Sequence, residues 1–264
     1  MEWERKVDKL IESGNERKAL QIIDAILNEN PNLQKALFSK AYIHQLQSEP
    51  KEALNAYLQL HSLQGEGSNL EDQIFVLDAI GELYRDMGDF KKAITYYRKE
   101  IEIIESNNSI LPDVILEERV FKLYDIAKIL ERMEKYKEAV CYHLKLVEIH
   151  REEPFNDTLS DDFLEIGRMY LKLQNYKSAI KYFSKALEIR NERGNTYDKF
   201  LLYFFLGKSY YNLKEFKKAR KYLRRSIEGF NLILFESNHS NINLTKIEEA
   251  ERLLQKIEEQ KKDT

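Results

Sequence analysis

The 264-residue sequence is poor in the two residues that most often form turns. It has nine glycines and four prolines, whereas folds rich in β-strands need many turns and use both residues often. Hydrophobic residues make up 43% of the chain and charged residues 33%. The apolar fraction is enough to bury a core, so the chain is not a disordered one. Abundant Lys, Glu, Leu, Ile and Ala instead favour helices joined by short loops.

Other absences exclude whole classes of protein. A single cysteine, Cys141, rules out an intramolecular disulfide framework and is typical of a reducing compartment. The N-terminal segment 1–14 is charged and has no apolar signal core. No window approaches the ~20 apolar residues of a membrane-spanning helix, and the net charge of −3 gives no general attraction to nucleic acids or acidic membranes. We therefore expect a soluble cytoplasmic protein.

Sequence signatures of catalysis are missing as well. There is no Gly-rich phosphate loop, no G-x-S-x-G, no H-E-x-x-H and no pair of cysteines. His143 and His150 are seven residues apart and could share one face of a helix, but a metal site would need further ligands. A packing or surface role is the expected one for both. The sequence thus predicts no enzyme activity, no cofactor and no metal.

Internally similar segments occupy most of the chain. In the three clearest copies, Gly81, Gly167 and Gly207 occupy one position. Each is followed by a tyrosine three residues later, an aromatic residue nine residues later and an alanine twelve residues later. A fourth copy has Ala127 in the glycine position, and two degenerate copies precede these four. Repetition of this kind predicts a stack of similar structural units.

The repeated residues resemble the tetratricopeptide repeat, which has L-G-x-x-Y, an aromatic after the turn, and then A-x-x-x-[YF]-x-x-A. Small residues let two antiparallel helices approach closely, and neighbouring pairs must stack to bury their apolar faces. Ala127, Gly167 and Gly207 are 40 residues apart, against ~34 in the standard repeat. Long repeats of this kind are similar to those of kinesin light chains, spindle-orientation adaptors and Rap-type peptide-pheromone receptors.

This resemblance implies an all-α fold, a right-handed superhelical solenoid of six helix pairs with a C-terminal capping helix. The capping helix is expected over 245–262, where an apolar stripe faces one side and charges face the other. A single array is expected to span 1–264. Its predicted repeats cover approximately 1–33, 34–68, 74–107, 120–153, 160–193 and 200–233.

The resemblance also implies a binding groove, because in this family the first helix of each pair lines the concave surface. Repeat positions 5, 9 and 13 form one stripe on each such helix. In the N-terminal half the stripes are acidic or apolar: Glu4, Asp8 and Glu12; Phe38, Tyr42 and Leu46; Asp78, Glu82 and Asp86. In the C-terminal half they are largely basic, with an apolar residue first: Tyr124, Lys128 and Arg132; Leu164, Arg168 and Lys172; Phe204, Lys208 and Asn212.

The function predicted from these stripes is that of a non-enzymatic adaptor that binds a peptide or protein. Lys128, Arg168 and Lys208 stand beside apolar residues, an arrangement suited to an acidic, partly apolar segment. The alternative explanation is that these charges simply form a solvated helix face. The carboxylate clamp of chaperone-binding relatives is absent, because the first three repeats carry acidic or apolar residues at its positions.

Two further functions remain open at this stage. One is a bacterial sensor or regulator that binds a short peptide, as pheromone receptors do, although the groove has basic residues where those receptors have asparagines. The other is a nucleic-acid-associated protein that uses the basic run 214–225. In that run Phe216 and Tyr222 occupy packing positions, which disfavours base stacking.

Overall fold

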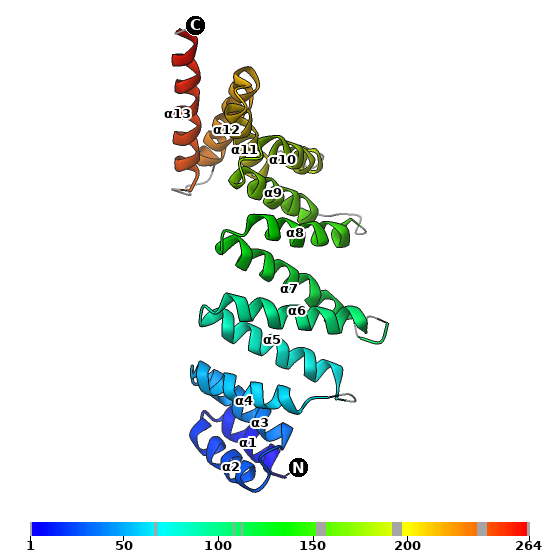
Figure 1. Ribbon diagram of the computed structural model, residues 1–264. Coiled ribbons are helices and arrows are strands. Elements are labelled where there is room, and N and C mark those ends of the chain that lie inside the picture. Colours follow the sequence, from blue (N-terminus) through cyan, green and yellow to red (C-terminus); the bar gives the residue numbers. More distant parts are fainter. Residues whose placement is uncertain are drawn as a thin grey trace. The chain divides into compact units, whose positions relative to one another are not determined.

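The computed structural model describes residues 2–65, 68–107, 109–111, 113–151, 157–191, 197–236 and 242–262. These residues form thirteen α-helices and no strand (Figure 1). The helices are α1 (Glu2–Glu12), α2 (Glu16–Glu29), α3 (Gln34–Leu46), α4 (Pro50–Leu63), α5 (Leu70–Asp86), α6 (Phe90–Ser106), α7 (Asp113–Arg132), α8 (Tyr136–His150), α9 (Asp157–Lys172), α10 (Tyr176–Asn191), α11 (Tyr197–Asn212), α12 (Phe216–Glu236) and α13 (Ile242–Lys262). The predicted all-α repeat fold of six helix pairs and a C-terminal helix is confirmed.

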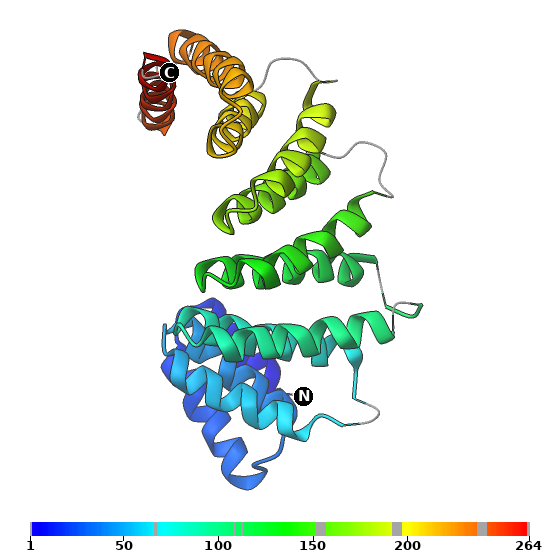
Figure 2. The ribbon, with the colours of Figure 1, turned by 45° about the horizontal axis from the view of Figure 1, so that its top comes forward.

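The chain divides into two compact units, Met1–Lys122 and Leu123–Thr264, which we call unit 1 and unit 2. Unit 1 contains α1 to α6 and the beginning of α7, coloured blue to green in Figure 2. Unit 2 contains the rest of α7 and α8 to α13. The single array over 1–264 stays a prediction. No described helix combines the length and the hydrophobicity that a membrane crossing requires.

The repeat glycines allow the two helices of a pair to meet closely. A Cβ atom on Gly81 would lie 2.5 Å from the ring of Tyr97, and one on Gly167 would lie 2.5 Å from the ring of Phe183. Both rings are fully buried. The close approach thus places a large ring against backbone, which fills the space between the helices without a cavity.

Stacked tyrosines join the two helices of three pairs at a second point. In each, a tyrosine of the first helix lies nearly parallel to one of the second, with ring centroids 5.5–5.6 Å apart and interplanar angles of 6–21°. Such offset contacts contribute about 0.5–1.5 kcal/mol each beyond the area that they bury. The pairs are Tyr84–Tyr96, Tyr170–Tyr182 and Tyr210–Tyr222.

The turn inside each pair uses one residue with a left-handed backbone. Glycine provides it at Gly14 and Gly88, with φ of 70° and 81°. Other residues provide it in the remaining four pairs, at Ser48, Glu134, Gln174 and Lys214, with φ of 56–61°. The chain therefore makes its six tight turns with few glycines, at a cost of about 1–2 kcal/mol for each non-glycine residue.

Helix α13 covers the last helix pair of unit 2. Its Ile247, Ala250 and Ile257 are buried and share a core with Phe200 and Phe230. Charged residues occupy most of its other positions, and these are largely exposed. This arrangement is that of a terminal cap, which hides the apolar edge of the repeats behind a polar outer face.

Candidate partner-binding surfaces

Unit 1 exposes large apolar side chains on its first helices. On α3, Tyr42 is 42% exposed and Leu46 is 48% exposed, and both continue the stripe that begins at Phe38. On α5, Phe75 is 45% exposed, and its ring centroid lies 5.2 Å from that of Phe38. The buried ring of Tyr57 on α4 lies 6.4 Å from Phe38 and 6.5 Å from Phe75. We call Phe38, Tyr42, Leu46 and Phe75 the aromatic patch.

The repeat places another exposed phenylalanine in the same register. Phe121 on α7 stands six residues before Ala127, as Phe75 stands six residues before Gly81. Its side chain is 65% exposed. Unit 1 therefore presents a phenylalanine at one repeat position on both α5 and α7. Neither residue was predicted to face a partner, because both lie outside repeat positions 5, 9 and 13.

A hollow of about 520 Å³ lies beside the aromatic patch, between α1, α3, α4 and α5. Phe38, Leu60 and Val76 form part of its apolar wall. Asp8 and Asp72 also line it, and neither carboxylate forms an ion pair with any residue that the structure describes. The hollow thus offers apolar surface next to uncompensated negative charge.

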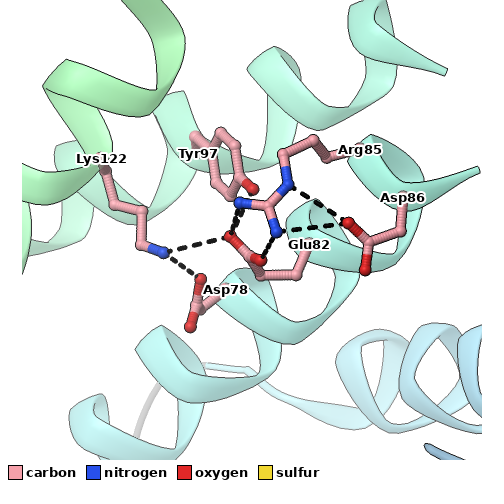
Figure 3. A network of polar contacts seen from close by, with 6 residues as sticks. All are labelled: Asp78, Glu82, Arg85, Asp86, Tyr97 and Lys122. Atoms are coloured by element: carbon pink, nitrogen blue, oxygen red, sulfur yellow. Dashed lines mark hydrogen bonds and ion pairs between the residues drawn. The ribbon is translucent and has the colours of Figure 1, made fainter. Parts of the chain in front are cut away.

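The acidic stripe predicted on α5 is instead joined to a lysine of α7 (Figure 3). Lys122 donates a hydrogen bond to Asp78, and its Nζ lies 3.6 Å from Glu82. Tyr97 on α6 donates a hydrogen bond of 2.7 Å to the same Glu82. Burial alone would lower the pKa of Lys122, but the hydrogen bond and the charge of Asp78 outweigh it and raise that pKa. The network holds α5, α6 and the start of α7 together.

Arg85 completes this network on the outer side of α5 (Figure 3). Its Nη1 donates a hydrogen bond of 2.8 Å to Glu82, and its Nη2 lies 3.2 Å from Asp86. The side chain of Asp86 remains 65% exposed. Of the predicted acidic stripe Asp78, Glu82 and Asp86, only Asp86 is therefore largely open to solvent.

Glu100 on α6 is a buried acid close to this network. Its side chain is fully buried, and neither carboxylate oxygen has a hydrogen-bond partner among the described residues. Burial raises its pKa to about 9, the charge of Asp78 adds to this, and Lys122 opposes it. Glu100 is therefore protonated at neutral pH. The sequence contained a signal for it, because Glu100 interrupts the apolar stripe of Tyr97, Ile101 and Ile104.

The cations predicted for the groove of unit 2 are already paired within the chain. Nζ of Lys128 lies 3.4 Å from Glu131 on its own helix and 3.4 Å from Glu165 on α9. Arg168 approaches the same two acids, at 2.9 Å from Glu165 and 3.9 Å from Glu131. Burial tends to lower the pKa of Lys128, but Glu165 and Glu131 outweigh it and raise that pKa. Two cations thus alternate with two anions across α7 and α9.

Lys208, the third predicted cation, binds the capping helix. Its Nζ donates a hydrogen bond of 2.6 Å to Glu249 of α13. Lys128, Arg168 and Lys208 therefore each have a carboxylate partner inside unit 2. The prediction that they meet the carboxylates of a bound acidic segment is not supported by this arrangement.

Two of the apolar residues predicted beside these cations are buried. Leu164 is 9% exposed and Phe204 is 2% exposed, and Phe204 belongs to the core that α13 covers. Their predicted role as contacts for a partner does not fit this burial, because the helix packing leaves little of either side chain accessible. Tyr124 is 44% exposed, with the Lys128 ammonium 5.2 Å from its ring centroid. Only Tyr124 keeps an open apolar surface.

The last predicted groove residues, Arg132, Lys172 and Asn212, are exposed at the ends of their helices. They are the final residues of α7, α9 and α11. Asn212 donates a hydrogen bond of 2.8 Å to the backbone oxygen of Lys208, which helps to finish α11.

His143 and His150 do share one face of α8, and Asp162 of α9 lies between them. Nδ1 of His150 lies 2.6 Å from one oxygen of Asp162, and Nδ1 of His143 lies 3.5 Å from the other. His143 is fully buried. Among the described residues no His, Cys, Asp or Glu group is arranged to hold a metal ion. The trio therefore joins α8 to α9 as an internal polar contact.

The sequence profile of the tetratricopeptide repeat family matches residues 32–106, 119–190 and 158–231. These matches cover more than half of the chain. The chain is a tetratricopeptide repeat protein. Such scaffolds are generally protein-interaction modules. Among curated protein sequences, none matches the chain.

Solved structures with the same fold resemble the chain in shape more than in sequence. BtubC (BKLC) from P. vanneervenii matches with a TM-score of 0.55 and 16% identity, over 89% of this chain and 94% of its own. A putative kinesin light chain from Podosopora anserina matches with a TM-score of 0.51 and 14% identity, over 74% and 96%. A STAND protein with a tetratricopeptide repeat sensor, from Pyrococcus horikoshii, matches with a TM-score of 0.54 and 20% identity, over 89% of this chain and 34% of its own. Likeness at these identities shows the fold alone.

Proposed function

We propose that the chain is a protein-binding adaptor that holds a segment of its partner on the aromatic patch of unit 1. The supporting observation is the exposure of Tyr42 and Leu46 on α3 and of Phe75 on α5, whose ring contacts that of Phe38. Adjacent exposed apolar groups rimmed by polar residues are typical of protein-interaction sites. Aromatic residues also dominate the binding energy of such sites. The expected setting is the cytoplasm, since the one cysteine suits a reducing compartment.

The proposed partner segment is apolar and carries a lysine or arginine. Its apolar side chains pack on the aromatic patch, and its cation enters the neighbouring hollow, where Asp8 and Asp72 lie. A cation there gains two carboxylates that have no described ion-pair partner, and its aliphatic stem lies along Leu60 and Val76. This partner is opposite in charge to the acidic segment predicted from the groove cations of unit 2.

A comparison of variants by affinity capture tests the proposal. Wild-type protein and a Tyr42→Ser/Leu46→Ser variant are used to retain proteins from native cell extract, which mass spectrometry then identifies. The proposal expects a partner that binds the wild type and binds the variant at least ~30-fold more weakly, as loss of a central apolar contact of about 2 kcal/mol implies. Titration of the purified partner measures that ratio.

Two controls separate this surface from others. A Met87→Ser/Leu232→Ser variant removes two apolar side chains that are also exposed but lie outside the patch, and it should retain the partner. A Lys128→Glu/Arg168→Glu variant tests the groove of unit 2. If the partner is lost by Lys128→Glu/Arg168→Glu but retained by Tyr42→Ser/Leu46→Ser, the proposal is refuted. The groove of unit 2 would then be the binding site, as the sequence predicted.

A further inference from the structure

The second helices of unit 2 carry exposed cations in matching positions. Residues of α12 follow their α10 equivalents by 40 in the sequence, and three such positions hold Lys177 and Lys217, Lys181 and Lys221, and Lys185 and Arg225. On each helix these positions are four residues apart, so they share one face. We call the exposed members together with Arg224 the outer basic surface: Lys177, Lys181, Lys217, Lys221, Arg224 and Arg225.

These cations differ from those on the first helices of the same unit. Within the part of the chain that the structure describes, none of the six forms an ion pair; Arg225 lies over the ring of Tyr203, 5.7 Å from its centroid. Lys128, Arg168 and Lys208, by contrast, each have a carboxylate within 3.4 Å. Unit 2 thus neutralises Lys128, Arg168 and Lys208 and leaves the six cations of the outer basic surface without a described carboxylate partner.

The position of the lysines along the helices makes this surface more positive. Lys177 and Lys217 lie in the first turns of α10 and α12, and neither first turn contains an acidic residue. The helix dipole already places partial positive charge there, so a lysine in the first turn is unfavourable by about 0.3–1 kcal/mol. The one carboxylate just before α12, Glu215, is held by Lys218 at 2.7 Å. Helix stability therefore does not account for these charges.

We propose that the outer basic surface binds an acidic, Asp- and Glu-rich segment of a protein, at a site separate from the aromatic patch. Cations four residues apart on a helix stand about 6 Å apart along its axis. Alternate residues of an extended chain stand about 6.6 Å apart, so an extended acidic segment can place a carboxylate near each cation. Such a segment receives its affinity from charge and needs no apolar pocket.

Two features favour an acidic protein segment over a nucleic acid. The tyrosines that lie between the cations, Tyr182 and Tyr222, are stacked on Tyr170 and Tyr210, so one face of each ring is already covered, which disfavours base stacking. The whole chain also has a net charge of −3, which opposes a long polyanion, whereas a short segment feels mainly charges within a Debye length of about 8 Å. A membrane is disfavoured because, of the large exposed apolar residues, none lies on α10 and one, Leu232, lies on α12, seven residues beyond Arg225.

Fluorescence anisotropy with a labelled deca-glutamate peptide tests the proposal. The wild type is compared with the variant Lys177→Gln/Lys181→Gln/Lys217→Gln/Lys221→Gln. We expect binding at low salt, at least a tenfold loss of affinity in this variant, and a further loss for the wild type when salt is raised fourfold. The matched control, Lys6→Gln/Lys9→Gln/Lys18→Gln/Lys51→Gln, changes four exposed lysines of unit 1 and should bind as the wild type does. The corresponding four Lys→Arg substitutions in unit 2 should keep the affinity.

Competition decides the class of ligand. Duplex DNA, duplex RNA and vesicles containing phosphatidylserine are each tested for displacement of the peptide. Equal affinities of the two Lys→Gln variants, no peptide binding by the wild type, or tighter binding of a nucleic acid or vesicle at the same four lysines would each overturn the proposal. The Tyr42→Ser/Leu46→Ser variant should bind the peptide normally, so this test and that of the proposed adaptor function can fail independently.

Discussion

On the first helices of unit 1, carboxylates gather around one buried lysine, and aromatic side chains are exposed to solvent. Asp78 and Glu82 share Lys122, while Tyr42 and Phe75 are 42% and 45% exposed. On the first helices of unit 2, cations alternate with acids, and two of the three corresponding apolar residues are buried: Leu164 is 9% exposed and Phe204 is 2% exposed. The same repeat thus supports an apolar, acidic surface in one unit and a neutralised surface in the other.

The difference in composition is large enough to matter for partners. Residues 1–122 contain 22 acidic and 15 basic side chains, whereas residues 123–264 contain 23 acidic and 27 basic ones. Unit 1 therefore carries a net charge of −7 and unit 2 one of +4. The stripes at repeat positions 5, 9 and 13 of the first helices did not reveal where the excess positive charge of unit 2 lies. In unit 2 it includes the six cations of the outer basic surface on α10 and α12, none of which forms an ion pair with a described residue.

The largest effect is expected from removing core contacts of the capping helix, which exists only in unit 2. Ile257→Ala should lower the free energy of unfolding by about 2–5 kcal/mol, because a buried aliphatic side chain leaves a cavity. Ile257 is 1% exposed. The control Leu244→Ala changes a residue of the same helix that is 46% exposed and should cost less than about 1 kcal/mol. Chemical unfolding followed by circular dichroism measures both; equal costs would contradict the capping assignment.

The loss of stability in Ile257→Ala should be confined to unit 2, so that the two units can be compared within one variant. The one tryptophan, Trp3, packs in the core of α1, α2 and α3 in unit 1. In Ile257→Ala the unfolding transition seen by circular dichroism should begin at a lower denaturant concentration than the one seen by tryptophan fluorescence. Coincident shifts of both transitions would show instead that the units unfold as one cooperative body.

The next largest effect is the contribution of Glu100 in unit 1 to the free energy of unfolding, which depends on pH. The pKa of Glu100 is about 9 in the folded chain, compared with an ordinary 4.5, so the folded state binds the proton more tightly than the unfolded state. The stability that this proton provides is complete below about pH 4.5 and is lost as the pH rises toward 9. At pH 7 the loss is about 3 kcal/mol. Glu100→Gln, which stays neutral, should recover much of it.

Urea unfolding of wild type and Glu100→Gln at pH 5, 7 and 8.5 checks this expectation. The difference in the free energy of unfolding should be less than about 1 kcal/mol at pH 5 and should grow with pH. Glu102→Gln is the matched control, because Glu102 lies on the same helix and is exposed; its difference should stay small at every pH. A stabilisation by Glu100→Gln that is the same at all three pH values would mean that the carboxyl does not titrate as described.

The sequence predicted the helix pairs well because the repeat encodes them locally. Gly81, Gly167 and the tyrosines after them are defined by spacing alone, and the structure gives each a packing contact. The binding surface was harder to predict because it depends on neighbours that are distant in sequence. Nothing local to Lys208 indicates that Glu249, 41 residues later, is its partner. Burial of Phe204 likewise depends on α13.

The smallest effect concerns the paired charges of unit 2. Glu165 is 16% exposed and lies near both Lys128 and Arg168, whose side chains are 34% and 40% exposed. Replacing either cation by glutamine removes one attraction across a partly solvated contact, which is expected to cost about 0.5 kcal/mol. Glu165→Gln removes two attractions at once and leaves both cations with Glu131 alone, so it should cost about 1 kcal/mol.

A double-mutant cycle separates these contributions. If Glu165 is the shared partner, Lys128→Gln should cost less in the Glu165→Gln background than in the wild type, and so should Arg168→Gln, because the carboxylate that each cation met is already gone. The coupling should shrink in 1 M salt, which screens charges that are partly exposed to solvent. Additive costs at low salt would show that these cations are not held by Glu165. They would then be available to a partner's carboxylates, and the first helices of unit 2 would present open positive charge where those of unit 1 present apolar side chains and acids.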